Sequence, residues 1–292
     1  MIRPFGGGRV GVNQSAWCYG TAVPWVVFTN VYVALCGAAL TAATYALLGL
    51  PPRLHPVAGL VFCCTLVIYN LDRLVEPNPG DSEHERWVES HRRPLWGLTL
   101  LASAGAIAFT TTLHLAAAVS LLIAGVVAVG YCLPVVYLRG RWCRLKALPG
   151  AKLVLIALVW TYATAGLPML NSGLVLDHHV VAILLARFFF IAAVALPFDL
   201  PDMQRDQRSG ITTLPILFGV QATRSIAFLL IMASMLLSLL NPWPHAAALL
   251  ISCACVMGLL ALLRPDRSVL YFMVALDGML LVKAVFLWAS AG

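Results

Sequence analysis

Long uninterrupted hydrophobic runs dominate the chain, and short polar segments separate them. Nine of these runs reach the length of a membrane-spanning helix, which needs about 20 residues at 1.5 Å of rise per residue. They cover residues 23–48, 56–75, 94–113, 115–137, 148–169, 180–199, 220–240, 245–263 and 268–289. The runs fill the chain, so the pattern predicts an all-α polytopic membrane protein with a single domain over residues 1–292.

The composition agrees with this class. Hydrophobic residues make up 61% of the chain and charged residues only 11%, whereas soluble domains carry about 25% charged residues. The net charge of +7 is spread over separate loops, so we expect no nucleic-acid partner. Residues 1–22 contain Gly6-Gly7-Gly8 and lack the apolar core of a signal peptide. We expect them to form a flexible cytosolic tail.

The loop charges predict the orientation. The loops after the odd-numbered runs hold Arg53 and almost no other basic residue. Most basic residues follow the even-numbered runs. They are Arg73, Arg86, Arg92 and Arg93 after the second run, Arg139, Arg141, Arg144 and Lys146 after the fourth, Arg205 and Arg208 after the sixth, and Arg264 and Arg267 after the eighth. Under the positive-inside rule the N-terminus and these loops face the cytosol, across the inner or plasma membrane if the protein is bacterial.

Two acidic clusters follow even-numbered runs. Asp199, Asp202 and Asp206 are spaced i, i+3 and i+7 after the sixth run, so on a helix they share one face. Asp72 and Glu76 form an i, i+4 pair after the second run. The predicted orientation places both clusters at the same membrane face, where they can form one site. Alternatively, Asp72 and Glu76 are ordinary interfacial charges at a helix end.

Acidic residues at the rim of a membrane span are costly unless a cation binds them. Mg²⁺ prefers oxygen ligands and is commonly held by one or two carboxylates together with substrate phosphates. The two clusters therefore predict a magnesium site for a phosphate-bearing lipid, and opposed acidic helices suit a diphosphate. If an allylic group loses that diphosphate, an apolar pocket excludes water and aromatic faces stabilise the cation.

These motifs resemble those of a known family. Asp199-Leu-Pro-Asp202-Met-Gln-Arg-Asp206, with Gly210-Ile-Thr-Thr-Leu-Pro after it, is similar to the second aspartate motif of the UbiA superfamily of intramembrane prenyltransferases. Tyr131-Cys-Leu-Pro134, followed by Arg139, resembles the family's Tyr-Pro-basic segment. The nine-span layout also matches, so the resemblance covers nearly the whole chain. It implies a ring of helices around a central cavity that binds a magnesium-bound prenyl diphosphate.

The resemblance also implies roles for individual residues. The expected magnesium ligands are Asp72, Glu76, Asp199, Asp202 and Asp206, of which all but Glu76 are also catalytic candidates. The expected diphosphate-binding residues are Arg139, Lys146, Lys152 and Tyr131, although Lys152 can instead extend to the lipid headgroups. The expected substrate-pocket residues are Asn30, Tyr69, Asn70, Trp160 and Phe198, with a hydrogen bond between helices as the alternative for Asn30.

The first motif departs from the family pattern, which is usually Asn-x-x-x-Asp-x-x-x-Asp. Ile68 stands where the pattern has Asn, and Glu76 stands where it has Asp. Asn70 is two positions out of register, which turns it about 200° around a helix. This motif is therefore weakened, and we expect a divergent branch of the superfamily.

Three functions are compatible with these patterns. The leading hypothesis is Mg²⁺-dependent transfer of a prenyl group to an acceptor that the sequence does not name, with no protein partner predicted. The second is a terpene cyclase of the same superfamily, which closes the cation on itself. The third is a non-catalytic transporter of an anionic lipid or metal, because Arg187, Asp277 and Lys283 lie deep within spans. We interpret Arg187 and Asp277 as a structural ion pair, with acceptor binding as the alternative.

Overall fold

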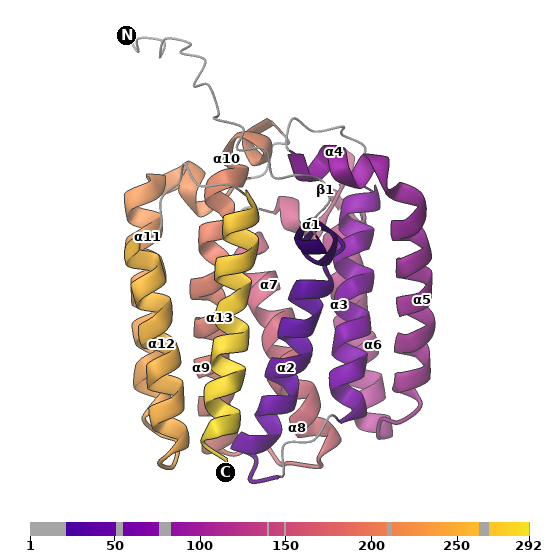
Figure 1. Cartoon of the computed structure of the whole chain (residues 1–292). Coiled ribbons are helices and arrows are strands. Elements are labelled where there is room, and N and C mark those ends of the chain that lie inside the picture. Colours follow the sequence, from indigo (N-terminus) through magenta and orange to yellow (C-terminus); the bar gives the residue numbers. More distant parts are fainter. Residues whose placement is uncertain are drawn as a thin grey trace.

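The computed structural model describes residues 22–50, 55–75, 83–138, 140–148, 150–208, 212–262 and 269–291. Long helices run side by side between two ends of the molecule (Figure 1). They are α2 (Val31–Leu47), α3 (Pro56–Val75), α5 (Arg92–Thr110), α6 (Leu115–Cys132), α7 (Ala151–Thr161), α9 (His178–Ala195), α11 (Leu214–Ser238), α12 (His245–Leu262) and α13 (Val269–Ala289). A π-helical turn (Tyr162–Gly166) and α8 (Leu167–Asn171) extend α7.

The predicted polytopic membrane fold is confirmed. Seven helices among the described residues are long and apolar enough to cross a membrane, and the apolar α2 is slightly shorter at 17 residues. Helix α5 occupies the third predicted span, residues 94–113, and carries Arg92 and Arg93 in its first turn. The predicted N-terminal tail lies almost entirely outside the described residues, and the orientation in the membrane stays a prediction.

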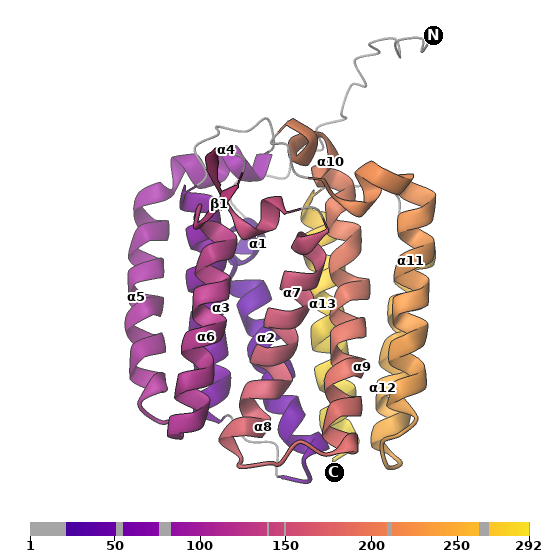
Figure 2. The same ribbon diagram turned by 180° about the vertical axis from the view of Figure 1, so that it is seen from behind.

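Short elements gather at one end of the bundle, which we call the α10 end. Figures 1 and 2 place α10 (Asp199–Arg208), α4 (Glu83–Ser90) and β1 (Val136–Leu138) there. Strand β1 pairs antiparallel with β2 (Arg141–Cys143), and a 3₁₀ turn (Leu145–Ala147) follows. Helix α1 (Ala22–Phe28) precedes α2 near the same end.

Two predicted spans differ from the structure. The run 115–137 ends as a helix at Cys132, and Leu133 is already extended at ψ 150°. Proline at position 134 explains this, because it disfavours helical geometry at the preceding residue. The first run is broken at Asn30, whose φ of 64° is left-handed and separates α1 from α2.

Six helices enclose a central cavity. They are α2, α3, α6, α7, α9 and α13, as the residues that line the cavity show. Helix α5 packs outside α3, whereas α11 and α12 pack outside α9 and α13. The α3–α5 contact depends on small residues: a Cβ added at Gly59 would lie 2.6 Å from the Phe109 ring, and one at Gly105 would lie 2.9 Å from Cys63 Sγ.

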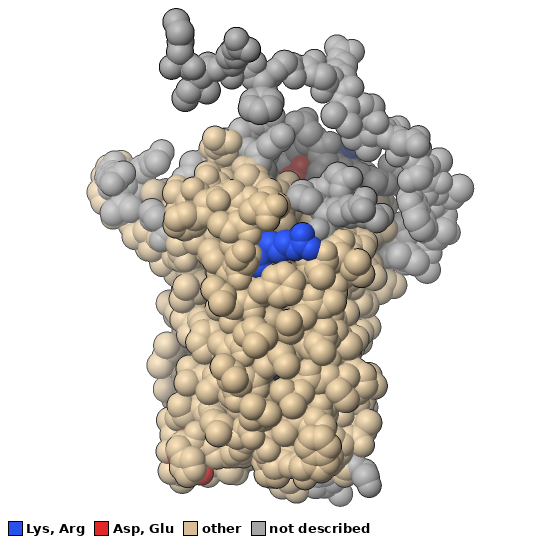
Figure 3. Space-filling model, turned by 90° about the vertical axis from the view of Figure 1, so that its left-hand side faces the viewer, with Lys and Arg blue, Asp and Glu red and all other residues tan. Residues whose placement is uncertain are grey.

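The outer surface suits lipid. Figure 3 looks onto the side where α11 and α12 lie, and the described surface there is almost free of charge apart from a basic patch toward the α10 end. Leu229 and Leu236 of α11 are 69% and 64% exposed. Because helices satisfy their own backbone hydrogen bonds, such an apolar wall can face hydrocarbon without penalty.

Candidate active site

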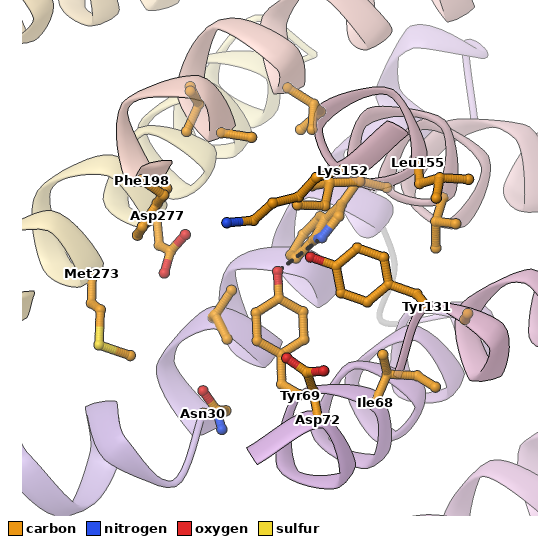
Figure 4. Close-up of a pocket in the computed structure, with 18 of the residues that line it drawn as sticks. Asn30, Ile68, Tyr69, Asp72, Tyr131, Lys152, Leu155, Phe198, Met273 and Asp277 are labelled. Carbon is orange, nitrogen blue, oxygen red and sulfur yellow. Dashed lines mark hydrogen bonds between the residues drawn. The ribbon is translucent and has the colours of Figure 1, made fainter. Parts of the chain in front are cut away.

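The cavity has a polar mouth and an apolar body. Its volume is about 230 Å³. Near the α10 end it is lined by Asp72 and Arg73 of α3, Tyr131 of α6, Lys152 of α7 and Asp199 of α10. Figure 4 shows Asp72, Tyr131 and Lys152 around the cavity. Asp72 and Asp199 therefore lie at the same end of one cavity, although more than 120 residues separate them in the sequence.

Lys152 joins the two described acids of α10. Its Nζ lies 2.8 Å from Asp199 Oδ1 and 2.8 Å from Asp206 Oδ2. Asp199 and Asp206 are seven residues apart, so two helical turns bring them to one face. The three side chains are 14%, 7% and 8% exposed, and the ammonium group therefore neutralises two mostly buried carboxylates.

A second lysine binds the first acidic motif. Lys146 Nζ lies 2.7 Å from Asp72 Oδ1 and 5.4 Å from the centre of the Tyr131 ring. The hairpin formed by β1 and β2 reverses the chain after α6 and so returns Lys146 to the end of α3. Each acidic motif thus carries a lysine within hydrogen-bond distance.

Aromatic side chains form much of the deeper wall. Trp160 Nε1 donates a hydrogen bond of 3.1 Å to Tyr69 Oη, which is the dashed line in Figure 4, and the two rings meet edge to face at 6.2 Å between centroids. Phe198 and Phe272 also line the cavity. These faces provide an apolar space next to the charged mouth.

Comparison with solved structures identifies the fold. A UbiA homolog from Archaeoglobus fulgidus bound to GPP and Mg²⁺ matches with a TM-score of 0.65 and 14% identity, over 92% of this chain and 99% of that one. The same archaeal protein bound to DMAPP and Mg²⁺ matches with a TM-score of 0.62 and 14% identity over the same shares of the two chains. The protein has the UbiA fold. A digeranylgeranylglyceryl phosphate synthase is also similar, with a TM-score of 0.53 and 13% identity over 92% of this chain and 97% of that one. Neither protein-family models nor curated protein sequences give a match.

In the first acidic motif, around Asp72, the asparagine lies at position 70, whereas the superfamily pattern resembled by this motif has it at position 68. Ile68 lines the cavity one turn before Asp72. Asn70, expected in the pocket, is not among the lining residues. It is buried, and its Oδ1 accepts a hydrogen bond of 2.8 Å from Asn30 Nδ2. Asn70 is two residues after Ile68, so it lies on a different face of α3. That face is turned toward the α1–α2 junction and away from the cavity, which corrects the expectation for Asn70.

Not every predicted ligand can be placed. Glu76 and Arg139 lie outside the described residues, and Asp202 lies in α10 with its side chain outside the described part. Among the described residues, no three His, Cys, Asp or Glu side chains are close enough to hold a metal alone. The carboxylates of Asp72, Asp199 and Asp206 nevertheless suit Mg²⁺, which commonly takes one or two carboxylates and completes its shell with water and phosphate oxygens.

The predicted Arg187–Asp277 ion pair is wrong. Arg187 is buried and donates hydrogen bonds to Thr164 Oγ1 at 3.1 Å and Thr44 Oγ1 at 3.2 Å. It lies one turn before Ile191, which lines the cavity, and thus one turn deeper than the cavity wall on α9. The buried Lys283 has its Nζ 3.8 Å from the centre of the Phe190 ring.

The sequence did not predict Met273 or Arg73 in the cavity, and it indicated ligand binding by Asp277 only as the alternative to an ion pair. Asp277 and Met273 of α13 line the cavity (Figure 4). Arg73 of α3 lines it as well. For Asp277 a signal was present, since an acid in the middle of a span is by default a functional candidate. Met273 gave no such signal, because methionine is unremarkable in an apolar helix.

Proposed function

We propose that the protein is a Mg²⁺-dependent intramembrane prenyltransferase, which moves an isoprenoid group from an allylic prenyl diphosphate to an acceptor and releases diphosphate. One observation carries the proposal: Asp72 and Asp199, each paired with a lysine, line the same end of one apolar cavity. The archaeal structures support it, because their protein has the same fold and was bound to GPP or DMAPP together with Mg²⁺.

Different residues would bind the diphosphate and the isoprenoid chain of the substrate. Asp72, Asp199 and Asp206 would hold Mg²⁺, with Glu76 and Asp202 as further candidates. When bound, Mg²⁺ supplies charge neutralisation for the diphosphate leaving group. Lys146 and Lys152 would then turn from the carboxylates to phosphate oxygens, joined by Arg139. The deeper wall would hold the isoprenoid chain and exclude water from the allylic cation, while Tyr69 and Trp160 present aromatic faces to it.

A terpene cyclase is the second candidate function. The observation that favours it is Ile68, an apolar residue that lines the cavity where the superfamily pattern has asparagine. Analysis of products formed without any acceptor separates the two candidates, because only a cyclase then yields a cyclic hydrocarbon or alcohol. The transporter hypothesis has less support, since Arg187 and Lys283 are not among the residues that line the cavity.

Release of diphosphate tests the proposal. The full-length protein in lipid nanodiscs should release diphosphate from C10, C15 or C20 prenyl diphosphates, alone or with a panel of acceptors, and EDTA should abolish the release. Asp72→Asn and Asp199→Asn should each lower the rate by about 100-fold or more, which is the usual effect of removing one group that stabilises transition-state charge.

Asp177→Asn is the matched control for these variants. Asp177 lies outside the cavity and caps α9, where its side chain accepts a hydrogen bond from Val180 N at 2.7 Å. Asparagine is an equally good cap, so the control makes the same chemical change with no expected effect on release. An absence of Mg²⁺-dependent release for every donor and acceptor would overturn the proposal.

A further inference from the structure

Asp277 presents a carboxylate to the apolar part of the cavity. Helix α13 lines the cavity with Phe272, Met273, Asp277 and Leu280, which fall on one helical face. Asp277 lies eight residues into α13, about 12 Å from the start of the helix by its rise. Figure 4 shows its carboxylate pointing into the cavity. Among the described residues, the acid and lysine pairs at the mouth do not include Asp277.

No described side chain neutralises this carboxylate. Within the described ranges no ion pair or hydrogen bond involves Asp277, and the titratable side chains within electrostatic range of it include Tyr32, Cys36 and Tyr69, which are uncharged. Tyr32 Oη donates to Val274 O at 3.1 Å, and Tyr69 Oη accepts from Trp160. Lys152, the lysine among the residues that line the cavity, binds Asp199 and Asp206.

The packing of α2 on α13 fixes this arrangement. A Cβ added at Gly278 would lie 2.8 Å from Tyr32 Oη, so only glycine lets Tyr32 lie against α13 beside Asp277. A carboxyl group in an apolar wall is costly in its ionised form unless a positive charge meets it, and it otherwise takes up a proton. A cationic ligand in the cavity would supply that charge and favour the ionised form of Asp277.

The surroundings favour an organic cation over a metal ion. A hard metal ion needs several oxygen ligands, whereas the α13 neighbours on this wall are Phe272, Met273 and Leu280. Aromatic faces beside a carboxylate are the usual recognition chemistry for a dispersed positive charge on carbon or nitrogen. Tyr69 and Trp160 supply such faces on the same cavity.

We infer that Asp277, together with Tyr69, Trp160 and Phe272, forms a binding site for positive charge on the isoprenoid chain. The identity of its natural ligand rests on the proposed function. When the C1–O bond of the prenyl diphosphate breaks, both bonding electrons leave with the diphosphate and the allylic group becomes a cation. The negative charge of Asp277 offsets that cation until an electron pair of the acceptor forms the new bond, or until loss of a proton forms an alkene.

Stable amines test the site without turnover. Geranylamine and farnesylamine carry a positive charge at neutral pH, and geraniol and farnesol are their neutral counterparts. Binding to the full-length protein in nanodiscs would be measured by calorimetry with Mg²⁺ and inorganic diphosphate present, with empty nanodiscs subtracted. The wild type should bind at least one amine about tenfold or more tightly than the matching alcohol.

The variants decide whether Asp277 causes this preference. Asp277→Asn should reduce the amine-to-alcohol ratio toward one, whereas Asp277→Glu should keep part of it and Asp177→Asn should keep all of it. Size-exclusion profiles would confirm that each variant is folded. A wild-type ratio near one, no amine binding at either chain length, or an unchanged ratio in Asp277→Asn would overturn the inference. Loss of diphosphate release with the amine preference intact would instead overturn only the proposed enzyme.

Discussion

Single residues decide the electrostatics of the cavity mouth. Lys152 is the extreme case, because one ammonium group contacts two carboxylates of α10 and all three side chains are mostly buried. The i, i+7 spacing of Asp199 and Asp206 made their shared face predictable from the sequence. Their pairing with Lys152 was not predictable, since Lys152 belongs to another helix and only the folded ring brings it there.

Removing Lys152 should destabilise the metal-free protein. In Lys152→Ala the buried carboxylates of Asp199 and Asp206 lose their counter-charge, and breaking such a buried pair costs roughly 3 kcal/mol. We expect a lower midpoint of thermal unfolding in EDTA. Mg²⁺ should raise that midpoint more in the variant than in the wild type, because no lysine then competes for the carboxylates.

An exposed ion pair provides the comparison. Arg92 Nη1 lies 3.3 Å from Glu89 Oε2, and their side chains are 38% and 58% exposed. Glu89→Ala should change stability by less than about 1 kcal/mol, as exposed pairs usually do. If Lys152→Ala in EDTA unfolds at the wild-type temperature, our account of the acid and lysine cluster is wrong.

At the scale of elements, the departures from long helices shape the site. The hydrophobic runs predicted the helices well, because length and apolarity alone decide whether a segment spans a membrane. They did not predict the hairpin formed by β1 and β2 or the break between α1 and α2. The break lies inside a predicted span at the polar Asn30, which donates a hydrogen bond to Asn70 of α3.

Two substitutions at Asn30 should separate the contributions of backbone strain and of the hydrogen bond to the stability of the protein. Asn30→Gly loses the 2.8 Å bond to Asn70 but adopts the φ of 64° freely. Asn30→Ala loses the same bond and also places a Cβ in the left-handed region, which costs about 1 kcal/mol more. Unfolding in denaturant should therefore rank wild type above Asn30→Gly and Asn30→Gly above Asn30→Ala. Equal stability of the two variants would contradict the role given to the backbone at this position.

On the scale of the whole molecule, the ring of α2, α3, α6, α7, α9 and α13 brings the two acidic motifs together. The sequence placed both motifs on one membrane face through the charges of the loops, and the structure places Asp72 and Asp199 at one cavity mouth. The role of Asp277 needed the structure. Whether Asp277 meets Arg187 depends on how α9 and α13 are rotated about their own axes. Both helices are apolar on all sides, so the sequence does not show which face of each points inward.

The most direct test is an experimental structure of the protein with Mn²⁺ in place of Mg²⁺ and geranyl S-thiolodiphosphate, a donor that resists cleavage. We expect anomalous density for the metal between Asp72 and Asp199, diphosphate oxygens within reach of Lys146 and Lys152, and the allylic carbons of the donor beside Tyr69 and Asp277. Metal density elsewhere, or a diphosphate bound outside the cavity, would contradict it.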